Sequence, residues 1–123
     1  MGAPESLLQR RARFIYGAGR LFTTCSGSSI VPPSWFDRDE GWRATFLGAC
    51  QMQMSENRAK TPEESHDRWV EHHKALGWTL GPKHDPKLRT HPNLKPWHDL
   101  PEAEQEKDRV FMALCIIAEQ AIT

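Results

Sequence analysis

Apolar side chains recur every three or four positions in four segments of the chain, which predicts four amphipathic α-helices. The first segment runs from about Glu5 to Phe22, and its predicted buried face is Leu7, Arg11, Phe14, Ile15, Ala18, Leu21 and Phe22. The second runs from about Asp37 to Met54, and its predicted buried face is Trp42, Thr45, Phe46, Ala49 and Met52. A loop rich in Ser, Gly and Pro separates these two segments.

The third helix has the clearest end signals in the sequence. Thr61 provides an N-cap, Pro62 occupies the first helical position, and Glu64 can accept from an otherwise unpaired backbone N–H. The helix is predicted to run to about Leu76 and to end at Gly77. Its predicted inner face is Trp69, Val70, His73 and Leu76.

The fourth helix is predicted from Pro101 to about Ala121. Its first turns are acidic, which suits the positive end of a helix dipole. Its apolar stripe is wide and consists of Phe111, Leu114, Cys115, Ala118, Ala121 and Ile122, broadened by Val110 and Ile117. We therefore expect this helix to be central to the fold.

Residues 77–100 have neither helical periodicity nor a long alternating pattern, because Gly81 and four prolines interrupt them. Only residues 77–80 could be extended. A loop of this length is uncommon in a small domain and is often functional.

Composition narrows the class of protein. The chain has 123 residues, 38% of them hydrophobic, which is enough for one compact unit. Lys and Arg balance Asp and Glu at 16 each, so a general nucleic-acid binder is not expected. No apolar run approaches a membrane span, and Arg10, Arg11 and Arg13 argue against a signal peptide. Three widely spaced cysteines favour a reducing compartment, so we expect a cytoplasmic protein.

The sequence contains no local signature of a metal site or of an activated nucleophile. There is no C-x-x-C, H-E-x-x-H, G-x-S-x-G or phosphate-binding loop. His66 and His73 lie seven residues apart, but no cysteine is near enough to complete a zinc site. We expect no metal, no cofactor and no catalytic residues.

Positive charge is concentrated in the long loop. Lys83, Lys87, Arg89 and Lys95 stand against a single acid, Asp85. Trp78 and Trp97 flank the segment. Cations pair with phosphate, and an indole face stacks on a nucleobase. In the alternative interpretation the tryptophans fill the core and the charges form a solvated rim.

A set of separated motifs resembles a known family. His66 and Trp69 lie three apart, and the stretches that follow are 77–87 (GWTLGPKHDPK), 90–94 (THPNL), 96–101 (PWHDLP) and 107–111 (KDRVF). Together they resemble the RyR domain, the repeat of ryanodine receptors that also occurs as small free-standing proteins in bacteria and phages. The resemblance covers residues 62–117. Leu80 and Trp97 stand where the family usually has Tyr, and Arg89 stands where it often has Lys.

The resemblance implies a mainly α fold, a four-helix RyR-type domain with a long Pro/Gly-rich loop and minimal extended structure. Residues 1–60 would form an N-terminal extension of two helices and residues 61–123 the RyR-type domain, in one compact unit overall. Because ryanodine receptors carry these repeats in tandem, a single copy is expected to form a homodimer.

The resemblance also implies ligand binding. The residues assigned to it are His66, Trp78, Gly81, Pro82, Lys83, Asp85, Lys87, Arg89, His91 and Trp97. The two tryptophans would hold a base, and the lysines and Arg89 would hold phosphates. The alternatives are that the Gly-Pro and His-Pro pairs only fix loop shape and that Asp85 caps a turn.

The expected function is non-enzymatic binding of an adenine nucleotide or of an NAD-derived, ADP-ribose-derived or cyclic nucleotide signal. Such a protein would sense or sequester a signal in the conflict between phages and bacteria. Two alternatives stay open. One is a protein-interaction module without a small ligand, and the other is a nucleotide-signal hydrolase with His66 or His91 as its acid–base residue.

Overall fold

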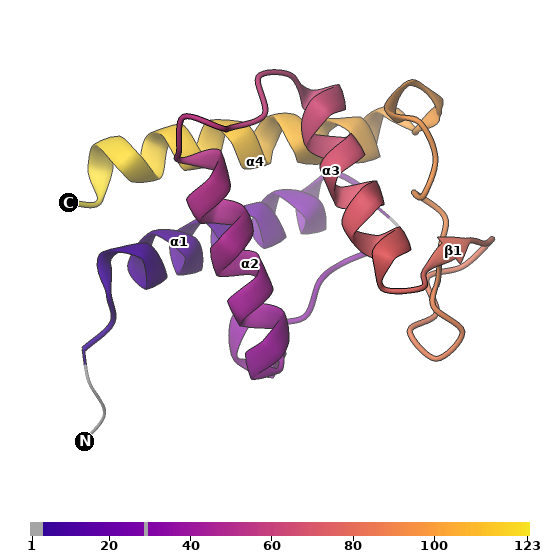
Figure 1. Ribbon diagram of the computed structural model, residues 1–123, viewed down its shortest axis with the longest axis horizontal. Coiled ribbons are helices and arrows are strands. Elements are labelled where there is room, and N and C mark those ends of the chain that lie inside the picture. Colours follow the sequence, from indigo (N-terminus) through magenta and orange to yellow (C-terminus); the bar gives the residue numbers. More distant parts are fainter. Residues whose placement is uncertain (1–3, 29) are drawn as a thin grey trace. The chain divides into compact units, whose positions relative to one another are not determined.

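The computed structural model of the chain describes residues 4–28 and 30–123 (Figure 1). The chain divides into two compact units. Unit 1 comprises residues up to Arg58 together with Val110–Thr123, and unit 2 comprises Ala59–Arg109. The last helix of the chain is thus divided between the two units, and the domain division expected from the sequence stays a prediction.

Unit 1 consists of α1 (Leu7–Cys25), the 3-10 helix η1 (Trp35–Asp37), α2 (Glu40–Gln53) and the second half of α4 (Glu102–Ala121). α1 begins with a capping box, in which the Ser6 hydroxyl accepts from the Gln9 N–H and the Gln9 side chain accepts from the Ser6 N–H. The fully buried core of the unit is Ala12, Ile15, Cys50, Cys115 and Ala118.

The predicted buried face of the second helix was wrong at three of its five positions. Thr45, Ala49 and Met52 are exposed, whereas Cys50 and Gln53 are buried. The Cys50 thiol is hydrogen-bonded to Cys115 of α4, and this contact together with burial raises the pKa of Cys50. Cysteine is among the residues most often buried, and the sequence interpretation gave it too little weight on this helix.

Several apolar residues predicted to be buried on the other helices are also exposed. They are Leu7, Phe14 and Leu21 on α1, Leu76 at the end of α3, and Ile117 and Ala121 on α4. On α1 the smaller Ala12 and the ring of Tyr16 take the buried positions instead. Tyr16 packs against Trp35, Trp42 and Phe46, with ring centroids 5.3–5.5 Å apart.

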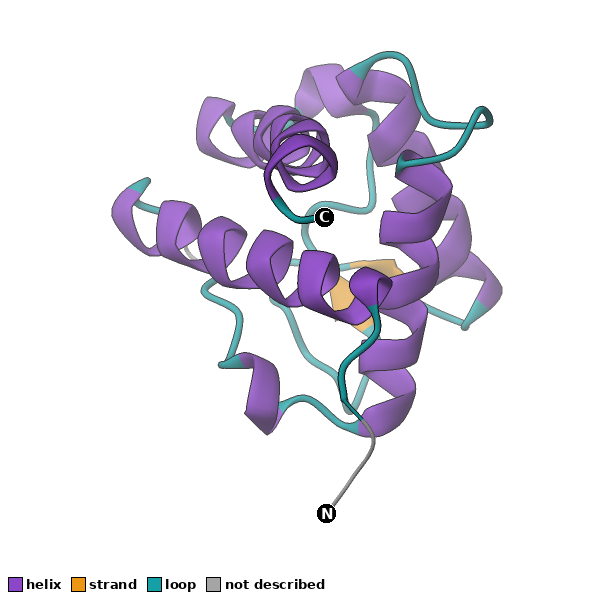
Figure 2. Ribbon diagram, turned by 90° about the vertical axis from the view of Figure 1, so that its left-hand side faces the viewer, coloured by secondary structure: helices purple, strands orange, loops and turns teal. Residues whose placement is uncertain are grey.

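Unit 2 consists of α3 (Pro62–Ala75), β1 (Thr79–Leu80), β2 (Thr90–His91), the 3-10 helix η2 (Trp97–Asp99) and the first part of α4. The Thr61 hydroxyl accepts from the Glu64 N–H, and the Glu64 carboxylate accepts from the Lys60 N–H, which confirms the predicted cap. The two strands form a parallel pair, shown in orange in Figure 2. The mainly α class with minimal extended structure is confirmed.

None of the helices among the described residues combines the length and the apolar character that crossing a membrane requires.

Candidate functional site

The end of α3 positions Trp78. Gly77 adopts a left-handed φ of 87°, which favours glycine. The Gly77 N–H donates to the Lys74 carbonyl and the Trp78 N–H to the His73 carbonyl, both at 3.0 Å. These two bonds are a Schellman motif, which commonly brings the residue after the glycine against the last turn of the helix. The Trp78 and His73 rings accordingly lie 5.5 Å apart.

A tight turn brings two further imidazoles to Trp78. The backbones of Asp85 and Thr90 pair in both directions at 3.0 and 3.1 Å. The Asp85 carboxylate accepts from the Lys87 N–H at 2.9 Å, so it caps this turn. His84 precedes the turn and stacks on Trp78, with centroids 5.7 Å apart and planes 24° apart. His91 follows the turn, and the centroid of its ring lies 4.9 Å from that of His84.

These rings form one group, which we call the Trp78 cluster: Trp69, His73, Trp78, His84 and His91. Trp69 contacts two of the histidines: its ring centroid lies 4.2 Å from that of His73 and 4.8 Å from that of His91. Trp78 is half-buried and His84 is exposed, whereas His91 is buried. The cluster therefore joins a packed interior to an aromatic surface that solvent reaches.

A series of hydrogen bonds that begins at α4 determines which ring nitrogen of His91 carries the proton. Its Nδ1 accepts from the Asn93 N–H at 3.1 Å, and the Asn93 side chain donates to the Glu104 carboxylate at 3.0 Å. Lys107 lies 2.6 Å from the same carboxylate. Burial, and then the neighbouring His84, lower the pKa of His91 to about 4. At neutral pH His91 is therefore uncharged, with its proton on Nε2.

His73 is held in the opposite tautomer. Its Nδ1 donates to the Trp69 carbonyl at 3.0 Å, so in the neutral ring Nε2 is an acceptor. Burial lowers the pKa of His73 below its ordinary value. Two neutral imidazoles with opposite hydrogen-bonding character thus stand beside Trp78, a set suited to a flat heteroaromatic group.

The comparison with protein families matches this part of the chain. The family model of the RyR domain matches residues 48–120. The chain belongs to the RyR domain family. The match contains the whole Trp78 cluster and the stretch 62–117 on which the resemblance was based. The curated proteins contain no match to the chain.

All three predicted phosphate-binding cations of the RyR domain are exposed. Lys83 and Lys87 are exposed, and within the described residues no ion pair engages either of them. Arg89 has a different role. It adopts a left-handed φ of 54° and donates from Nη1 to the Leu76 carbonyl at 2.7 Å. Arg89 therefore caps the C-terminus of α3, where a cation is favoured.

Gly81 permits the close approach of the two strands. A Cβ at this position would lie 2.6 Å from the Thr90 Cβ, so any side chain would force the strands apart. The Thr90 hydroxyl donates to the Lys83 carbonyl at 2.9 Å, which fixes the chain just after Pro82. Gly81 thus shapes the loop, as in the alternative that the sequence left open for the Gly-Pro pair.

Trp97 does not share a stacking face with Trp78. It is 7% exposed, lies on η2 and packs with α3. Among the described residues no ring contact joins the two tryptophans, and the Arg109 guanidinium lies 5.1 Å from the centre of the Trp97 ring. The expected face of two tryptophans is replaced by Trp78 with His84, because the core of the RyR domain takes Trp97.

His66 is also an interior residue of the RyR domain. It is 3% exposed, and its Nε2 donates to the Lys95 carbonyl at 2.7 Å. Its Nδ1 lies 3.8 Å from the carboxyl of Asp108. Burial raises the pKa of Asp108 to about 7, against opposing effects of Lys107 and of the Trp97 indole N–H. His66 therefore anchors the loop and does not line the surface beside Trp78.

Sequence reasoning did not assign five of the contributors to the site: Trp69, His73, His84, Asn93 and Glu104. His73 and Trp69 had been assigned only to the inner face of their helix, although their i, i+4 spacing next to Gly77 was a usable signal. Asn93 and Glu104 gave no signal in the sequence, because their contact crosses from the loop to α4. Among the described residues, no three His, Cys, Asp or Glu side chains converge as metal ligands.

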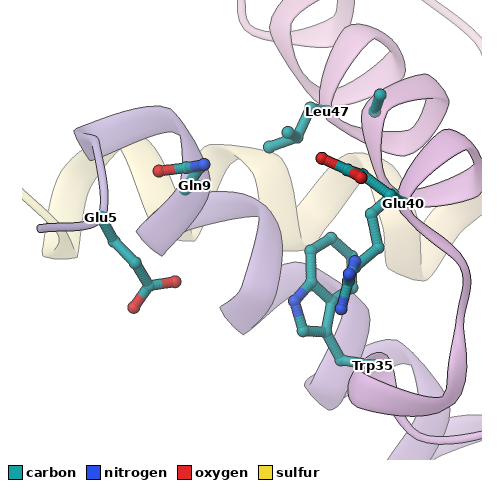
Figure 3. A pocket seen from close by; sticks show the side chains of 7 residues that line it. Glu5, Gln9, Trp35, Glu40 and Leu47 are labelled. Atoms are coloured by element: carbon teal, nitrogen blue, oxygen red, sulfur yellow. The ribbon is translucent and has the colours of Figure 1, made fainter. Parts of the chain in front are cut away.

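A hollow lies in unit 1, outside the residues that the RyR model matches (Figure 3). Its volume is about 260 Å³, and its lining residues are Glu5, Gln9, Trp35, Glu40, Arg43, Ala44 and Leu47. The Glu5 carboxylate is already paired with Arg13 at 2.9 Å, and the Gln9 amide belongs to the capping box of α1. None of the ligand-binding residues that the sequence predicts lines this hollow.

Proposed function

We propose that this RyR-domain protein binds a nucleotide-type ligand without transforming it. The base would lie against Trp78, and phosphates would contact Lys83 and Lys87. The observation that carries the proposal is a half-buried indole beside two neutral imidazoles, followed in the chain by two exposed cations. An adenine nucleotide, an NAD- or ADP-ribose-derived molecule or a cyclic nucleotide combines the base and the phosphates that such a surface fits.

The protonation of the cluster supports binding over turnover. A general acid–base residue works best with a pKa near the operating pH. The pKa of His91 is instead lowered to about 4, and that of His73 is also lowered. In each ring, Nδ1 is already hydrogen-bonded to a backbone group. The Nε2 of His66 is hydrogen-bonded to the Lys95 carbonyl. These groups are suited to orient a ligand, and the protein would act as a sensor or as a sequestering protein in phage–bacterium conflict.

One observation favours a protein-interaction module as the second candidate. Three leucines near Trp78 in the sequence are exposed: Leu76 (51%), Leu80 (59%) and Leu88 (72%). Exposed apolar residues next to an indole are typical of a contact with another protein. Binding to such a partner would resist high salt and would not compete with nucleotides, which distinguishes it from the first candidate.

The direct test is a thermal-shift screen with adenine nucleotides, ADP-ribose, cyclic ADP-ribose isomers and cyclic dinucleotides. A ligand at about 100 times its dissociation constant adds about 2.7 kcal/mol of stability, which is several degrees for a domain of this size. Each ligand that shifts the transition is recovered and chromatographed. Intact ligand supports the proposal, its conversion points to the hydrolase, and the absence of any shift points to a protein partner.

Replacing Trp78 by alanine is expected to abolish the thermal shift with little change in helical circular dichroism. Trp78 is half-buried and lies after the end of α3, so its loss removes the stacking surface and leaves the helices in place. Base–aromatic stacking is worth about 1–3 kcal/mol per base. A Trp78→Ala protein that keeps its full ligand response contradicts the assignment.

The double variant Lys83→Ala, Lys87→Ala is expected to bind more weakly at low salt and to approach wild-type affinity at high salt. Salt screens the phosphate contacts that these exposed lysines would make. The matched control is Lys60→Ala with Lys74→Ala, which removes two exposed lysines outside the turn. Equal weakening in both double variants would indicate a general charge effect and not a phosphate site.

A further inference from the structure

Three apolar side chains of α1 are exposed, although the same helix contributes to the core of unit 1. Leu7 is 42% exposed, Phe14 is 38% exposed and Leu21 is 67% exposed. Each is about two helical turns from the next, so the three form one line, which we call the α1 stripe. The core uses other positions of the helix, Ala12 and Ile15. In Figure 2, α1 runs across the side of unit 1 that is turned to the viewer.

The charged side chains of α1 are all positive. The helix contains Arg10, Arg11, Arg13 and Arg20, with no acidic residue and no lysine. Arg13 is paired at 2.9 Å with Glu5, which precedes the helix. Arg11 and Arg20 donate to backbone carbonyls, which carry no net charge and therefore leave these arginines uncompensated. The helix thus keeps a positive surface beside its exposed apolar residues.

Arginines border the α1 stripe on both sides. Arg10 lies three residues after Leu7 and four before Phe14, whereas Arg11 lies four after Leu7 and three before Phe14. On a helix, these spacings place the two arginines one turn from the stripe, at its opposite edges. Arg10 is exposed and Arg11 is half-buried. Arginine stems cover apolar surface, and their planar ends bind phosphate through two parallel hydrogen bonds.

The charge of the whole chain indicates which kind of partner α1 would meet. Lys and Arg equal Asp and Glu at 16 each, so the residues outside α1 carry the compensating acidic excess. An anionic surface would therefore attract α1 and repel the rest of the chain, which orients the protein. A second copy of α1 would bring like charges together. A nucleic acid would offer phosphates but no apolar surface for the α1 stripe.

We propose that α1 attaches the protein to the surface of an anionic lipid bilayer. The helix lies in the plane of the interface, with the α1 stripe at the level of the first acyl carbons and the guanidinium groups at the lipid phosphates. Three apolar side chains give a weak and reversible attachment that salt reduces. The α1 stripe precedes the residues that the RyR model matches, and the proposal does not rest on ligand binding at Trp78.

Co-sedimentation with lipid vesicles tests the attachment. The protein is expected to sediment with vesicles of phosphatidylglycerol and phosphatidylcholine and to stay in the supernatant with phosphatidylcholine alone. Leu21→Gln should lower the partition coefficient by about tenfold, since a largely exposed leucine loses its transfer into the acyl region. The matched control is Leu88→Gln, which makes the same change at a leucine that is 72% exposed in unit 2 and should bind as the wild type does.

The charge contribution is tested by Arg10→Gln. At low salt this variant should bind anionic vesicles about fivefold more weakly, the effect expected for one basic residue at an anionic membrane surface. At high salt the difference from the wild type should disappear, because the interaction is screened. Arg68→Gln is the matched control, since Arg68 is an exposed arginine on α3 in unit 2.

Cys25 provides a test of which face of the helix contacts lipid. It is exposed, whereas Cys50 and Cys115 are buried, and it lies four residues after Leu21 on the side of the α1 stripe. An environment-sensitive dye on Cys25 should shift its emission to the blue with anionic vesicles. The same dye on a Leu88→Cys variant that also carries Cys25→Ser should not shift.

Three results would overturn the proposal. The first is a protein that stays in the supernatant with anionic vesicles, which would make an acidic protein surface the remaining partner for α1. The second is equal binding to vesicles with and without phosphatidylglycerol. The third is equal binding of Leu21→Gln and the wild type.

Discussion

The Trp97→Ala variant is expected to lose about 3–5 kcal/mol of its free energy of unfolding, the usual cost of truncating a buried tryptophan. Trp97 is 7% exposed, and its carbonyl accepts from the Gln105 side chain at 3.1 Å and from the Leu100 N–H at 3.1 Å. Its ring also lies beneath the Arg109 guanidinium. The total free energy of unfolding of a small domain is only about 5–15 kcal/mol, so this loss can unfold unit 2.

Urea denaturation followed by circular dichroism measures this effect, with His98→Ala as the control. His98 is the exposed neighbour of Trp97 on the same 3-10 helix, and its removal should change stability by less than about 0.5 kcal/mol. A Trp97→Ala protein that is as stable as the wild type but fails to bind nucleotide would place Trp97 in the ligand site after all.

The second large effect is a pH dependence of stability that arises at Asp108. Its carboxyl side chain is 17% exposed, and burial raises its pKa to about 7. Between the ordinary pKa near 3.8 and pH 7, the folded protein keeps a proton that the unfolded chain releases. The contribution of Asp108 to stability therefore falls as the pH rises through this range and stays low above it.

Asp108→Asn should abolish this fall, because an amide keeps the neutral form at every pH. The three-unit shift corresponds to at most about 4 kcal/mol above pH 7, reduced by the partial exposure of the side chain. The groups around Asp108 are His66, Lys107, Glu104 and the Trp97 indole N–H, and all of them remain in the variant.

Thermal denaturation of both proteins from pH 4 to pH 8 isolates the effect in the difference between them. His91 and His73 act in the opposite direction, since their lowered pKa values make stability rise with pH below about 6.5. Their contribution is common to both proteins and cancels. Equal stability of the two proteins at pH 8 would contradict the raised pKa of Asp108.

Local signals explain why the helices and their ends could be predicted from sequence. Thr61, Pro62 and Gly77 act within one helical turn, and the structure places each in the role that the sequence predicts. The Gly-Trp and Gly-Pro pairs carried enough family signal to identify the RyR domain, which the family match confirms.

The roles of single side chains in the long loop depend on contacts that the sequence does not display. Arg89 looked like a phosphate ligand, but its left-handed backbone turns its guanidinium to the end of α3. Trp97 looked like a stacking residue, but it lies on η2 and is buried where η2 packs against α3. The buried positions of α2 were misjudged because the Cys50 thiol is hydrogen-bonded to the Cys115 thiol, which lies more than 60 residues away in the chain.

The central claim is that the surface at Trp78 binds a nucleotide-type ligand. Its most direct test is isothermal titration calorimetry of ADP-ribose, ATP and a cyclic ADP-ribose isomer at low salt. The proteins compared are the wild type, Trp78→Ala, and Phe36→Ala as an aromatic control that is 74% exposed in unit 1. The account predicts that at least one of these molecules binds the wild type and Phe36→Ala equally well and does not bind Trp78→Ala. Equal affinity for wild type and Trp78→Ala, or no binding of any of the three, would contradict it.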